Sequence, residues 1–302
     1  MSARVTDNAT EWAFSLGWAA MRGVPERTAY RMFERVADRT WKRQGTSVVQ
    51  LERNLSRVHP NATTAELREL SLLGVRSHMR YWCEAFRLPT WSRERISSTF
   101  SLDRVHLLDD AMSSGTGAIM VVNHGGNWDH AGAWGALRYG SLTTVAERLK
   151  PEAVFEQFVA YRESLGMEIL PLGDSDTFRV LVQRLRNGGL VPLAGDRDIS
   201  RRGIVVDFFG EPASMPAGPA LLGILTGAPV YPVTLTFGDG VALGTVHDRI
   251  AVPEQGSREA KVREMTQGLA RAWESAIPAR SYDWHVMQPL WLADLDARRR
   301  SA

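Results

Sequence analysis

A histidine, two glycines and an aspartate stand close together in the stretch VVNHGGNWDHAG, residues 121–132, which looks like the exit of a buried strand. Asp129 comes five residues after His124, in the expected first turn of the next helix, from which a folded-back loop could bring its carboxylate to the imidazole. A carboxylate on one ring nitrogen fixes the tautomer and leaves the other nitrogen free to take a proton. The spacing therefore predicts a base that can deprotonate an alcohol, with Asp129 as its orienting acid.

The residues between these two suggest room for a substrate. Gly125 and Gly126 let the backbone adopt conformations closed to other residues and let a substrate come close, and Asn127 joins them as a candidate for substrate contact. In an open α/β sheet, ligands gather at the carboxyl ends of the strands, where this loop is expected. A purely structural interpretation, with His124 in a satisfied loop and Asp129 as a helix-start acid, remains open.

Two other chemistries are less well supported. The sequence has no G-x-S-x-G elbow, and nothing marks Cys83, inside a helical pattern, as activated. Direct transfer between two bound substrates is therefore expected, without a covalent intermediate. His124, Asp129 and His130 could instead be metal ligands, but adjacent Asp and His side chains usually diverge and no further histidine cluster is evident. No metal is expected.

The composition is that of an ordinary globular protein. The chain has 302 residues, of which 44% are hydrophobic and 23% charged. Because the formal net charge is only +2, a preference for anionic partners must come from the arrangement of the charges, and no nucleic-acid partner is expected. The single Cys83 cannot form an internal disulfide, which predicts a reducing, cytoplasmic setting.

Helical patterns fill the first part of the chain. Residues 8–87 read as helical throughout, and the apolar segment EWAFSLGWAAM carries Trp12 and Trp18. A further helix is expected to start at Thr63, because Thr63 and Glu66 have the spacing of a capping box.

A basic ridge is expected on one of these helices. Its arginines recur at every fourth position: Arg27, Arg31, Arg35, Arg39 and Arg43. The ridge is either a solvated face, partly neutralised by Glu26, Glu34 and Asp38, or part of an interfacial element that meets anionic lipid.

After about residue 115, short apolar runs alternate with helical patterns. The expected strands are GAIMVVNH, SLTTVAE, MEILPLG, GLVPLAG and PVYPVTLTF, and the expected helices between them are NWDHAGAWGALRYG, PEAVFEQFVAYRESLG, DTFRVLVQRLRNGG and MPAGPALLGILTG. This alternation predicts an α/β fold with a mostly parallel central sheet flanked by helices. VALGTVHDRIAV adds a strand after a hairpin turn at GDGVALG, and SREAKVREMTQGLARAWESAI is a late helix.

We expect a single domain over residues 1–302, with a mainly helical, membrane-facing cap over 1–110 and an α/β catalytic core over 111–302. The longest uncharged run, Pro212 to Gly238, is interrupted by five prolines. It is expected to form a buried helix followed by a strand and not a membrane span, so any membrane contact would be peripheral.

Several stretches, in this order, resemble a known enzyme family. H-G-G-N-W-D fits the H-x4-D box of glycerolipid acyltransferases. Three further stretches resemble one branch of them, the bacterial lipid A biosynthesis acyltransferases and the actinobacterial phosphatidylinositol mannoside acyltransferases: FVAYRESLGMEILPLG, LVPLAGDRDISRRGIVVDFFGEPASMPAGPALLGILTGAPVYPV and the terminal SYDWHVMQPLW. The resemblance covers residues 110–292, and the arginine-rich composition is closer to the mannoside branch.

The resemblance implies a glycerolipid acyltransferase-like fold and an activity. The family transfers a fatty acyl group from a thioester carrier to a hydroxyl, and in the mannoside branch palmitoyl-CoA is the donor and a mannose primary hydroxyl of phosphatidylinositol mannoside the acceptor. His124 would be the general base and Asp129 its orienting acid. Acyl-CoA would be a co-substrate, with no cofactor. The enzyme would be a peripheral protein, favoured as a monomer, on anionic lipid at the cytoplasmic face of the cell membrane.

Three more site residues follow from the resemblance and from a second strand end. Arg162, in YRESLG, matches a basic position of the family and could face a donor or acceptor phosphate, because a guanidinium suits paired phosphate oxygens. Asp196 and Asp198, in GDRD, follow another apolar strand. Asp198 is favoured as a second acid near His124, and Asp196 as a substrate contact. Surface, capping or ion-pairing roles remain open for all three.

A basic turn and an apolar run complete the candidates. Arg201, Arg202 and the backbone at Gly203 and Ile204 could contact the CoA phosphates, although a solvated basic turn fits the same residues. The run from Pro212 to Gly238 could line a channel for the acyl chain, although most of it would be apolar in any buried core.

Two alternatives to the mannoside activity remain open. The acceptor could be another glycolipid or lysophospholipid, of the lipid A type. The chain could also be a non-catalytic protein that keeps the fold and binds acyl-CoA and lipid without turnover, although the intact His124 and Asp129 argue against such decay.

Overall fold

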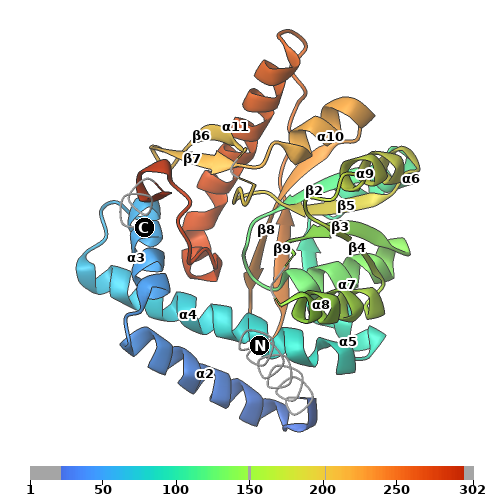
Figure 1. The fold of residues 1–302 in the computed structure, drawn as a ribbon. Coiled ribbons are helices and arrows are strands. Elements are labelled where there is room, and N and C mark those ends of the chain that lie inside the picture. The colour runs from blue at the N-terminus through green and yellow to red at the C-terminus, as the bar shows by residue number, and fades with distance from the viewer. Residues whose placement is uncertain (1–21, 149–150, 201, 296–302) are drawn as a thin grey trace, which may run out of the picture.

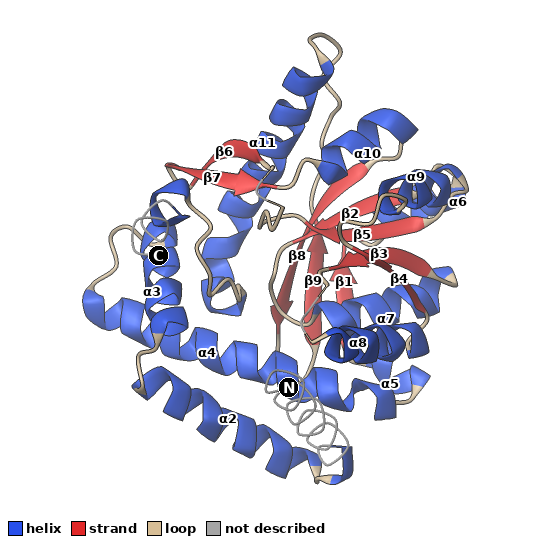
Figure 2. Ribbon diagram, viewed as in Figure 1, coloured by secondary structure: helices blue, strands red, loops and turns tan. Residues whose placement is uncertain are grey.

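The computed structural model describes residues 22–148, 151–200 and 202–295. A mostly parallel central sheet is flanked by helices, and a helical N-terminal region lies beside it (Figure 1, Figure 2). The predicted fold class is confirmed. The division of the chain at residue 110 stays a prediction, and the apolar segment with Trp12 and Trp18 lies outside the described residues.

From residue 22, where the description of the chain begins, the helical N-terminal region includes α2 (Glu26–Lys42), α3 (Thr46–Val58) and α4 (Thr64–Arg87). α4 begins with the predicted capping box, in which Glu66 N donates to Thr63 Oγ1 at 3.3 Å and Thr63 N donates to Glu66 Oε2 at 2.7 Å. α2 runs along α4 (Figure 1). The small residues Ala29 and Ala37 are buried on the inner face of α2, which lets the two helices approach closely.

The central sheet has five strands in the order β1-β9-β8-β2-β5. They are β1 (Phe100–Asp103), β2 (Ala118–Val122), β5 (Leu190–Ala194), β8 (Val230–Phe237) and β9 (Ala242–Val246). All neighbouring pairs are parallel except β8 and β9, which form an antiparallel hairpin. The predicted turn between them is confirmed, because Gly238 N donates to Val241 O at 2.9 Å.

Two smaller sheets and the flanking helices make up the rest of the described residues. β3 (Leu142–Ala146) pairs in parallel with β4 (Met167–Pro171), and β6 (Ile204–Phe208) forms an antiparallel hairpin with β7 (Glu211–Met215). The remaining helices are α5 (Arg93–Ser98), α6 (His106–Ser113), α7 (Trp128–Tyr139), α8 (Glu152–Ser164), α9 (Thr177–Arg186), α10 (Gly218–Thr226) and α11 (Arg258–Ala276), with 3₁₀ helices η1 (Leu88–Thr90) and η2 (Ile277–Asp283). Neither β1 nor the β6–β7 hairpin is predicted from the sequence.

Two hydrophobic cores cover opposite faces of the sheet. Ile119 and Val121 of β2 pack into the core shared with α9, α10 and α11. Ala118 and Met120 pack into the core shared with α4, α6 and α7. Successive side chains of a strand point to opposite faces, so a strand buried on both faces is apolar at every position. This explains why β2 reads as an unbroken apolar run.

The basic ridge of α2 faces outward. Its exposed arginines in the helix are Arg27, Arg31, Arg35 and Arg39. Two acids of α2 pair with other helices instead: Glu26 with Arg95 of α5, and Asp38 with Arg76 of α4, each at 2.7 Å. Neutralisation of the ridge by Glu26 and Asp38 is therefore not observed. Among the described helices, none has both the length and the apolar character needed to cross a membrane.

Candidate active site

Strand register brings His124 and Asp196 together at the carboxyl edge of the central sheet. Val122 of β2 pairs with Ala194 of β5, and each of the two polar residues stands two positions beyond that pair. Parallel neighbours end at the same edge of a sheet, so the two side chains meet there. Position 195, between Ala194 and Asp196, requires a glycine, because a Cβ there would come within 2.2 Å of the side chain of Val121.

Asp196 is fully buried, and its carboxylate is satisfied by His124 and Trp284. Asp196 Oδ1 lies 2.5 Å from His124 Nδ1, while Asp196 Oδ2 accepts from His124 N at 2.9 Å and from Trp284 Nε1 at 2.8 Å. An ionised carboxylate only accepts, so the ring proton of His124 belongs on Nδ1 and Nε2 is left as the basic nitrogen. The carboxylate that pairs with His124 is therefore Asp196, which has no exposed surface for the predicted substrate contact, and the predicted pairing of His124 with Asp129 is wrong.

The pair shifts the pKa of both partners. Burial lowers the pKa of His124, but the charge and hydrogen bond of Asp196 outweigh burial and hold that pKa above its ordinary value. Burial raises the pKa of Asp196, but the charge of His124 and hydrogen bonds from His124 and Trp284 outweigh it, so the net pKa is lowered. Asp196 thus stays ionised and can stabilise an imidazolium.

Gly125 and Gly126 allow the loop to pack against β8. A Cβ at Gly125 would come within 2.5 Å of Leu235 O, and one at Gly126 within 2.7 Å of Thr236 N. Gly126 also has φ +52°, a conformation that favours glycine, and its N–H donates to Asp283 O at 3.0 Å. Backbone atoms therefore fill the space beside both glycines. The substrate contact predicted at Gly125 and Gly126 is not found there.

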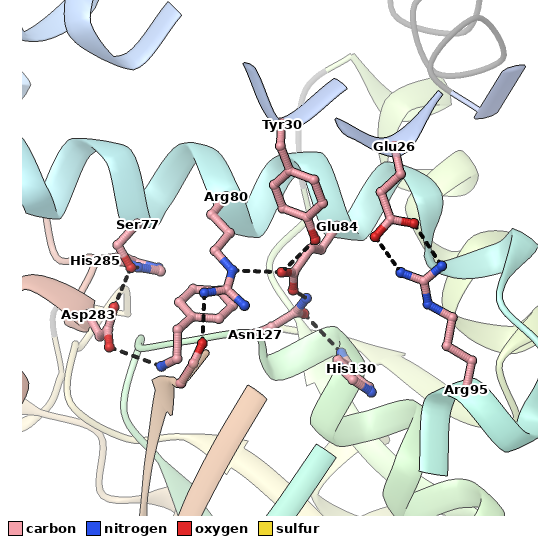
Figure 3. A network of polar contacts seen from close by, with 12 residues as sticks. Glu26, Tyr30, Ser77, Arg80, Glu84, Arg95, Asn127, His130, Asp283 and His285 are labelled. Atoms are coloured by element: carbon pink, nitrogen blue, oxygen red, sulfur yellow. Dashed lines mark hydrogen bonds and ion pairs between the residues drawn. The ribbon is translucent and has the colours of Figure 1, made fainter. Parts of the chain in front are cut away.

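Asn127 is the N-cap of α7 and is buried. Asn127 Oδ1 accepts from His130 N at 2.9 Å, and Asn127 Nδ2 donates to Glu84 Oε2 at 2.8 Å (Figure 3). Both ends of the amide are used within the protein. The expected substrate contact of Asn127 is thus replaced by a helix cap.

Asp129 takes part in a second buried ion pair. Arg162 Nε of α8 donates to Asp129 Oδ1 at 2.7 Å, and Tyr81 Oη of α4 donates to Asp129 Oδ2 at 2.9 Å. The Trp128 ring lies between the two pairs, with its centroid 3.9 Å from that of Tyr81 and 5.9 Å from that of His124. The H-x4-D box therefore contributes one residue to each of two charged pairs.

The three residues proposed as metal ligands do not gather. His130 Nε2 lies 2.9 Å from Ile96 O, away from the His124–Asp196 pair. In the parts of the chain that the structure describes, no group of three or more His, Cys, Asp or Glu side chains could hold a metal ion.

The carboxylate of Asp198 is hydrogen-bonded mainly within its own turn. Asp198 Oδ1 accepts from Ser200 N and Oγ at 2.9 and 2.7 Å, and Asp198 Oδ2 accepts from Gly203 N at 2.8 Å and from Ser214 Oγ at 3.1 Å. These donors hold the carboxylate within the turn and against β7. Both oxygens of Asp198 are therefore bound to Ser200, Gly203 or Ser214, and the hydrogen-bond partner of His124 is Asp196.

The basic turn is only partly available to a substrate. Gly203 N is occupied by Asp198, which removes the expected backbone contact there, and Ile204 is half-buried at the start of β6. Arg202 is exposed and stays a candidate, whereas Arg201 lies outside the described residues.

A cavity of about 400 Å³ opens beside His124. Its charged lining residues come from the strand ends and from α7 and α8: His124, Asp129, Glu147, Arg162 and Arg197. Its apolar lining residues include Tyr81, Phe100, Met120, Val122, Trp128, Ala131, Trp134, Leu142, Phe155, Phe158, Met167 and Leu190. Of the uncharged run at 212–238, only Leu235 lines this cavity, so an acyl channel along that run stays a prediction.

Trp284 and Tyr81 are site residues that sequence reasoning missed. Trp284 is far from Asp196 in the chain, and only its place in the terminal stretch SYDWHVMQPLW pointed to it. Tyr81 lies in a helical pattern, where an aromatic residue reads as core. Neither position carries a local spacing that indicates its partner.

Comparison with known proteins extends this description. The bacterial lipid A biosynthesis acyltransferase family matches the chain over residues 1–293. In two strains of Mycobacterium tuberculosis, proteins named phosphatidylinositol mannoside acyltransferase are 43% identical to it over 303 residues, covering 98% of this chain and 93% of each relative. A protein of the same name from Mycolicibacterium smegmatis is 40% identical over 295 residues, covering 97% of this chain and 94% of the relative.

Proposed function

Because this chain belongs to the bacterial lipid A biosynthesis acyltransferase family and is an O-acyltransferase, we propose that it moves a palmitoyl group from acyl-CoA to a mannose hydroxyl of phosphatidylinositol mannoside. The names of the mycobacterial relatives support this acceptor. The observation that carries the chemistry is His124, held through Nδ1 by a buried carboxylate and placed beside a largely apolar cavity.

In the proposed reaction, His124 acts as a general base and then as a general acid. Nε2 takes the proton of the acceptor hydroxyl while that oxygen attacks the thioester carbonyl carbon. A C–O bond forms, and the carbonyl becomes an oxyanion. When the oxyanion collapses, the C–S bond breaks and the CoA thiolate takes the proton from the imidazolium, so the acyl group never becomes attached to the protein. Asp196 stabilises the imidazolium between the two proton transfers.

Arg162 is suited to negative charge in this reaction. Burial lowers its pKa, but the charge of Asp129 outweighs burial and keeps that pKa above its ordinary value, so the guanidinium stays charged. Asp129 holds Nε, and the side chain lines the cavity. The guanidinium of Arg162 can therefore face the developing oxyanion or a substrate phosphate. Arg197, which also lines the cavity, and the exposed Arg202 are candidates for the CoA phosphates.

The apolar part of the cavity is proposed to hold the acyl chain. Its walls are formed by aromatic and aliphatic side chains such as Trp128, Phe158 and Leu142. A chain seated there would exclude water from the thioester and so suppress hydrolysis of the donor. No cofactor is proposed, since acyl-CoA is itself a substrate.

We further propose that the enzyme works as a peripheral protein, and as a monomer, on anionic lipid at the cytoplasmic face of the cell membrane. The contact with anionic lipid is supported by the outer face of α2, where Met32 and Val36 are 42% and 51% exposed beside the arginine ridge. Exposed apolar side chains among arginines suit a helix that lies in a headgroup layer. Replacing Arg31 and Arg35 by glutamate should weaken flotation with anionic vesicles, and unchanged flotation would contradict this surface.

The acceptor can be tested with the purified full-length chain and labelled palmitoyl-CoA. Phosphatidylinositol mannoside, a lipid A precursor and a lysophospholipid are offered separately, and the lipid products are analysed. Label on the mannoside alone is expected. Label on one of the other lipids would replace the proposed acceptor, and binding of palmitoyl-CoA without any turnover would support the non-catalytic alternative.

A further inference from the structure

A buried carboxylate outside the reaction centre connects three helices. Glu84 of α4 is 3% exposed. It accepts three hydrogen bonds, from Tyr30 Oη of α2 at 3.0 Å, from Arg80 Nε of α4 at 2.8 Å and from Asn127 Nδ2 at 2.8 Å (Figure 3). One oxygen thus faces the outer helix, and the other faces the loop that carries His124.

The chemistry of this cluster requires a carboxylate. All three partners present hydrogen-bond donors, and a glutamine in place of Glu84 would turn an NH₂ group toward at least one of them. A buried charge is costly unless it is paired, and Arg80 supplies the pairing cation. In proteins, well-packed apolar side chains often replace a buried ion pair with no loss of stability, so such a pair is not needed merely to pack helices together. The arrangement therefore fixes a specific geometry and does more than hold the helices together.

The geometry that it fixes is that of the first turn of α7. Tyr81 and Glu84 are three residues apart and share one face of α4. Tyr81 donates to Asp129, and Glu84 accepts from Asn127, so α4 holds that turn at two points. Between these points lies Trp128, whose ring packs against His124. A small rotation of this turn would therefore move the Trp128 ring, which packs against the imidazole of His124.

The other end of the network lies on α2. Tyr30 donates to the same oxygen of Glu84 as Arg80 does. α2 is the helix whose exposed arginines and apolar residues are proposed to meet lipid. A single relay, Tyr30 to Glu84 to Asn127, thus connects this surface helix with the loop of the H-x4-D box.

We infer that Glu84 is a positioning residue for acyl transfer, which holds the first turn of α7 in place against His124, and that Tyr30 extends this support to α2. The inference rests on the proposed function, because the rate that it concerns is that of acyl transfer. Its structural consequence is independent of the substrate, because loss of the network frees the first turn of α7.

Three variants of the full-length chain test this inference. Glu84→Gln keeps the size of the side chain and removes its charge, and Tyr30→Phe removes one donor. Trp41→Phe is the matched control, because Trp41 Nε1 donates to Ser71 Oγ at 2.8 Å and so also joins α2 to α4, without touching Glu84. For each variant, kcat and KM for palmitoyl-CoA, the melting temperature and amide hydrogen exchange are measured.

The expected result is a graded loss of kcat. Glu84→Gln should lower kcat about 50-fold and Tyr30→Phe about fivefold, with KM changed less than about threefold, since misplacement of a catalytic group slows the chemical step more than it weakens binding. Trp41→Phe should change kcat less than about twofold. Amide exchange over residues 127–131 should become faster in the first two variants and stay unchanged in the control.

Several outcomes would overturn the inference. A Glu84→Gln variant with the kcat of the parent would do so, as would equal losses in Tyr30→Phe and Trp41→Phe at equal melting temperatures. If Glu84→Gln does not fold, Tyr30→Phe against Trp41→Phe decides. If the parent chain does not acylate the mannoside, the proposed function fails, and hydrogen exchange over residues 127–131 still decides whether Glu84 positions the loop.

Discussion

Asp196 and Asp129 are two buried aspartates at the same site, and their partners differ. Asp196 holds an imidazole, which can take and release a proton near neutral pH, and an indole N–H. Asp129 holds a guanidinium, which keeps its charge at all working pH values, and a phenol. The Trp128 ring packs against Tyr81, a partner of Asp129, and also lies beside His124, the partner of Asp196.

The partner of a buried carboxylate decides what that carboxylate can do. Beside His124, a carboxylate orients a base and stabilises its protonated form. Beside Arg162, a carboxylate balances a fixed charge, and its removal leaves an unpaired buried cation. Replacing Asp196 should therefore act mainly on the rate, and replacing Asp129 mainly on stability.

The largest effect on rate is expected for Asp196→Asn. The neutral amide neither fixes the Nδ1 tautomer nor stabilises the imidazolium, so kcat should fall about 1000-fold. Steady-state transfer to phosphatidylinositol mannoside measures it, with circular dichroism as the check on folding. A folded variant that retains a tenth or more of the parent kcat would show that Asp196 does not act mainly on the rate.

The same variant should shift the pH dependence of activity. Because His124 must be neutral to act as a base and its pKa is raised above 6.5, kcat/KM of the parent should increase as pH rises through that raised value. Without Asp196 the pKa falls, so the acid limb should move to lower pH. An acid limb at the same pH in both proteins would show that another group sets it.

The pair should also contribute to stability over a definite pH range. The raised pKa of His124 gives stability that is fully present below pH 6.5 and is lost as pH rises through the folded-state pKa. The lowered pKa of Asp196 gives stability that is present above pH 3.8 and is lost as pH falls through its folded-state pKa. Urea unfolding should therefore show the largest difference in the free energy of unfolding, parent against Asp196→Asn, from pH 3.8 to pH 6.5. A difference that is flat from pH 3 to pH 9 would contradict this.

The second effect in size is expected for Asp129→Asn. Arg162 and Tyr81 lose a charged partner in a buried place, so the free energy of unfolding should fall by about 2–4 kcal/mol. Urea titration at neutral pH measures the loss, and kcat of the folded fraction should fall much less than in Asp196→Asn. If Asp129→Asn instead loses as much kcat as Asp196→Asn without losing stability, the two aspartates act alike and the distinction fails.

A smaller effect is expected for Trp284→Phe. The substitution removes the N–H that donates to Asp196 Oδ2 and keeps an aromatic ring, so kcat should fall about tenfold. In the double variant with Asp196→Asn, the effect of Trp284→Phe on kcat should largely vanish, because the acceptor of its N–H has already changed. Fully additive effects would show that Trp284 acts by packing alone.

The smallest effect is expected for Asp198→Asn. This carboxylate is held within its own turn by Ser200, Gly203 and Ser214, so its replacement should lower kcat less than about fivefold. The same transfer assay compares it directly with Asp196→Asn. A loss as large as that of Asp196→Asn would restore Asp198 as the acid that supports His124.

Local patterns predicted the parts of the fold that depend on nearby residues. The unbroken apolar run of β2, the capping box at Thr63 and the turn after β8 follow from short-range rules, and all three are found. The β6–β7 hairpin was missed because its residues read as a basic turn followed by an uncharged run. Local patterns also did not predict which strands are neighbours, because the pairing of β2 with β5 joins segments about 70 residues apart.

The site was predicted in composition but not in its pairing. His124, Asp129, Arg162 and Asp196 were all singled out from the sequence, and the structure brings them to one place. Spacing favoured Asp129 as the partner of His124, whereas strand register decides for Asp196. Asn127 and Gly125 were read as substrate contacts, because a sequence does not show that another strand or helix fills the space beside them.

The most direct test of the central proposal is transfer of labelled palmitate from palmitoyl-CoA to phosphatidylinositol mannoside by the parent chain and by His124→Ala. We expect label on the mannoside with the parent, no acyl-protein adduct in its mass spectrum, and at least about a 1000-fold slower transfer by a folded His124→Ala variant. Transfer by His124→Ala at the rate of the parent, or label that passes through the protein, would contradict direct transfer with His124 as the base.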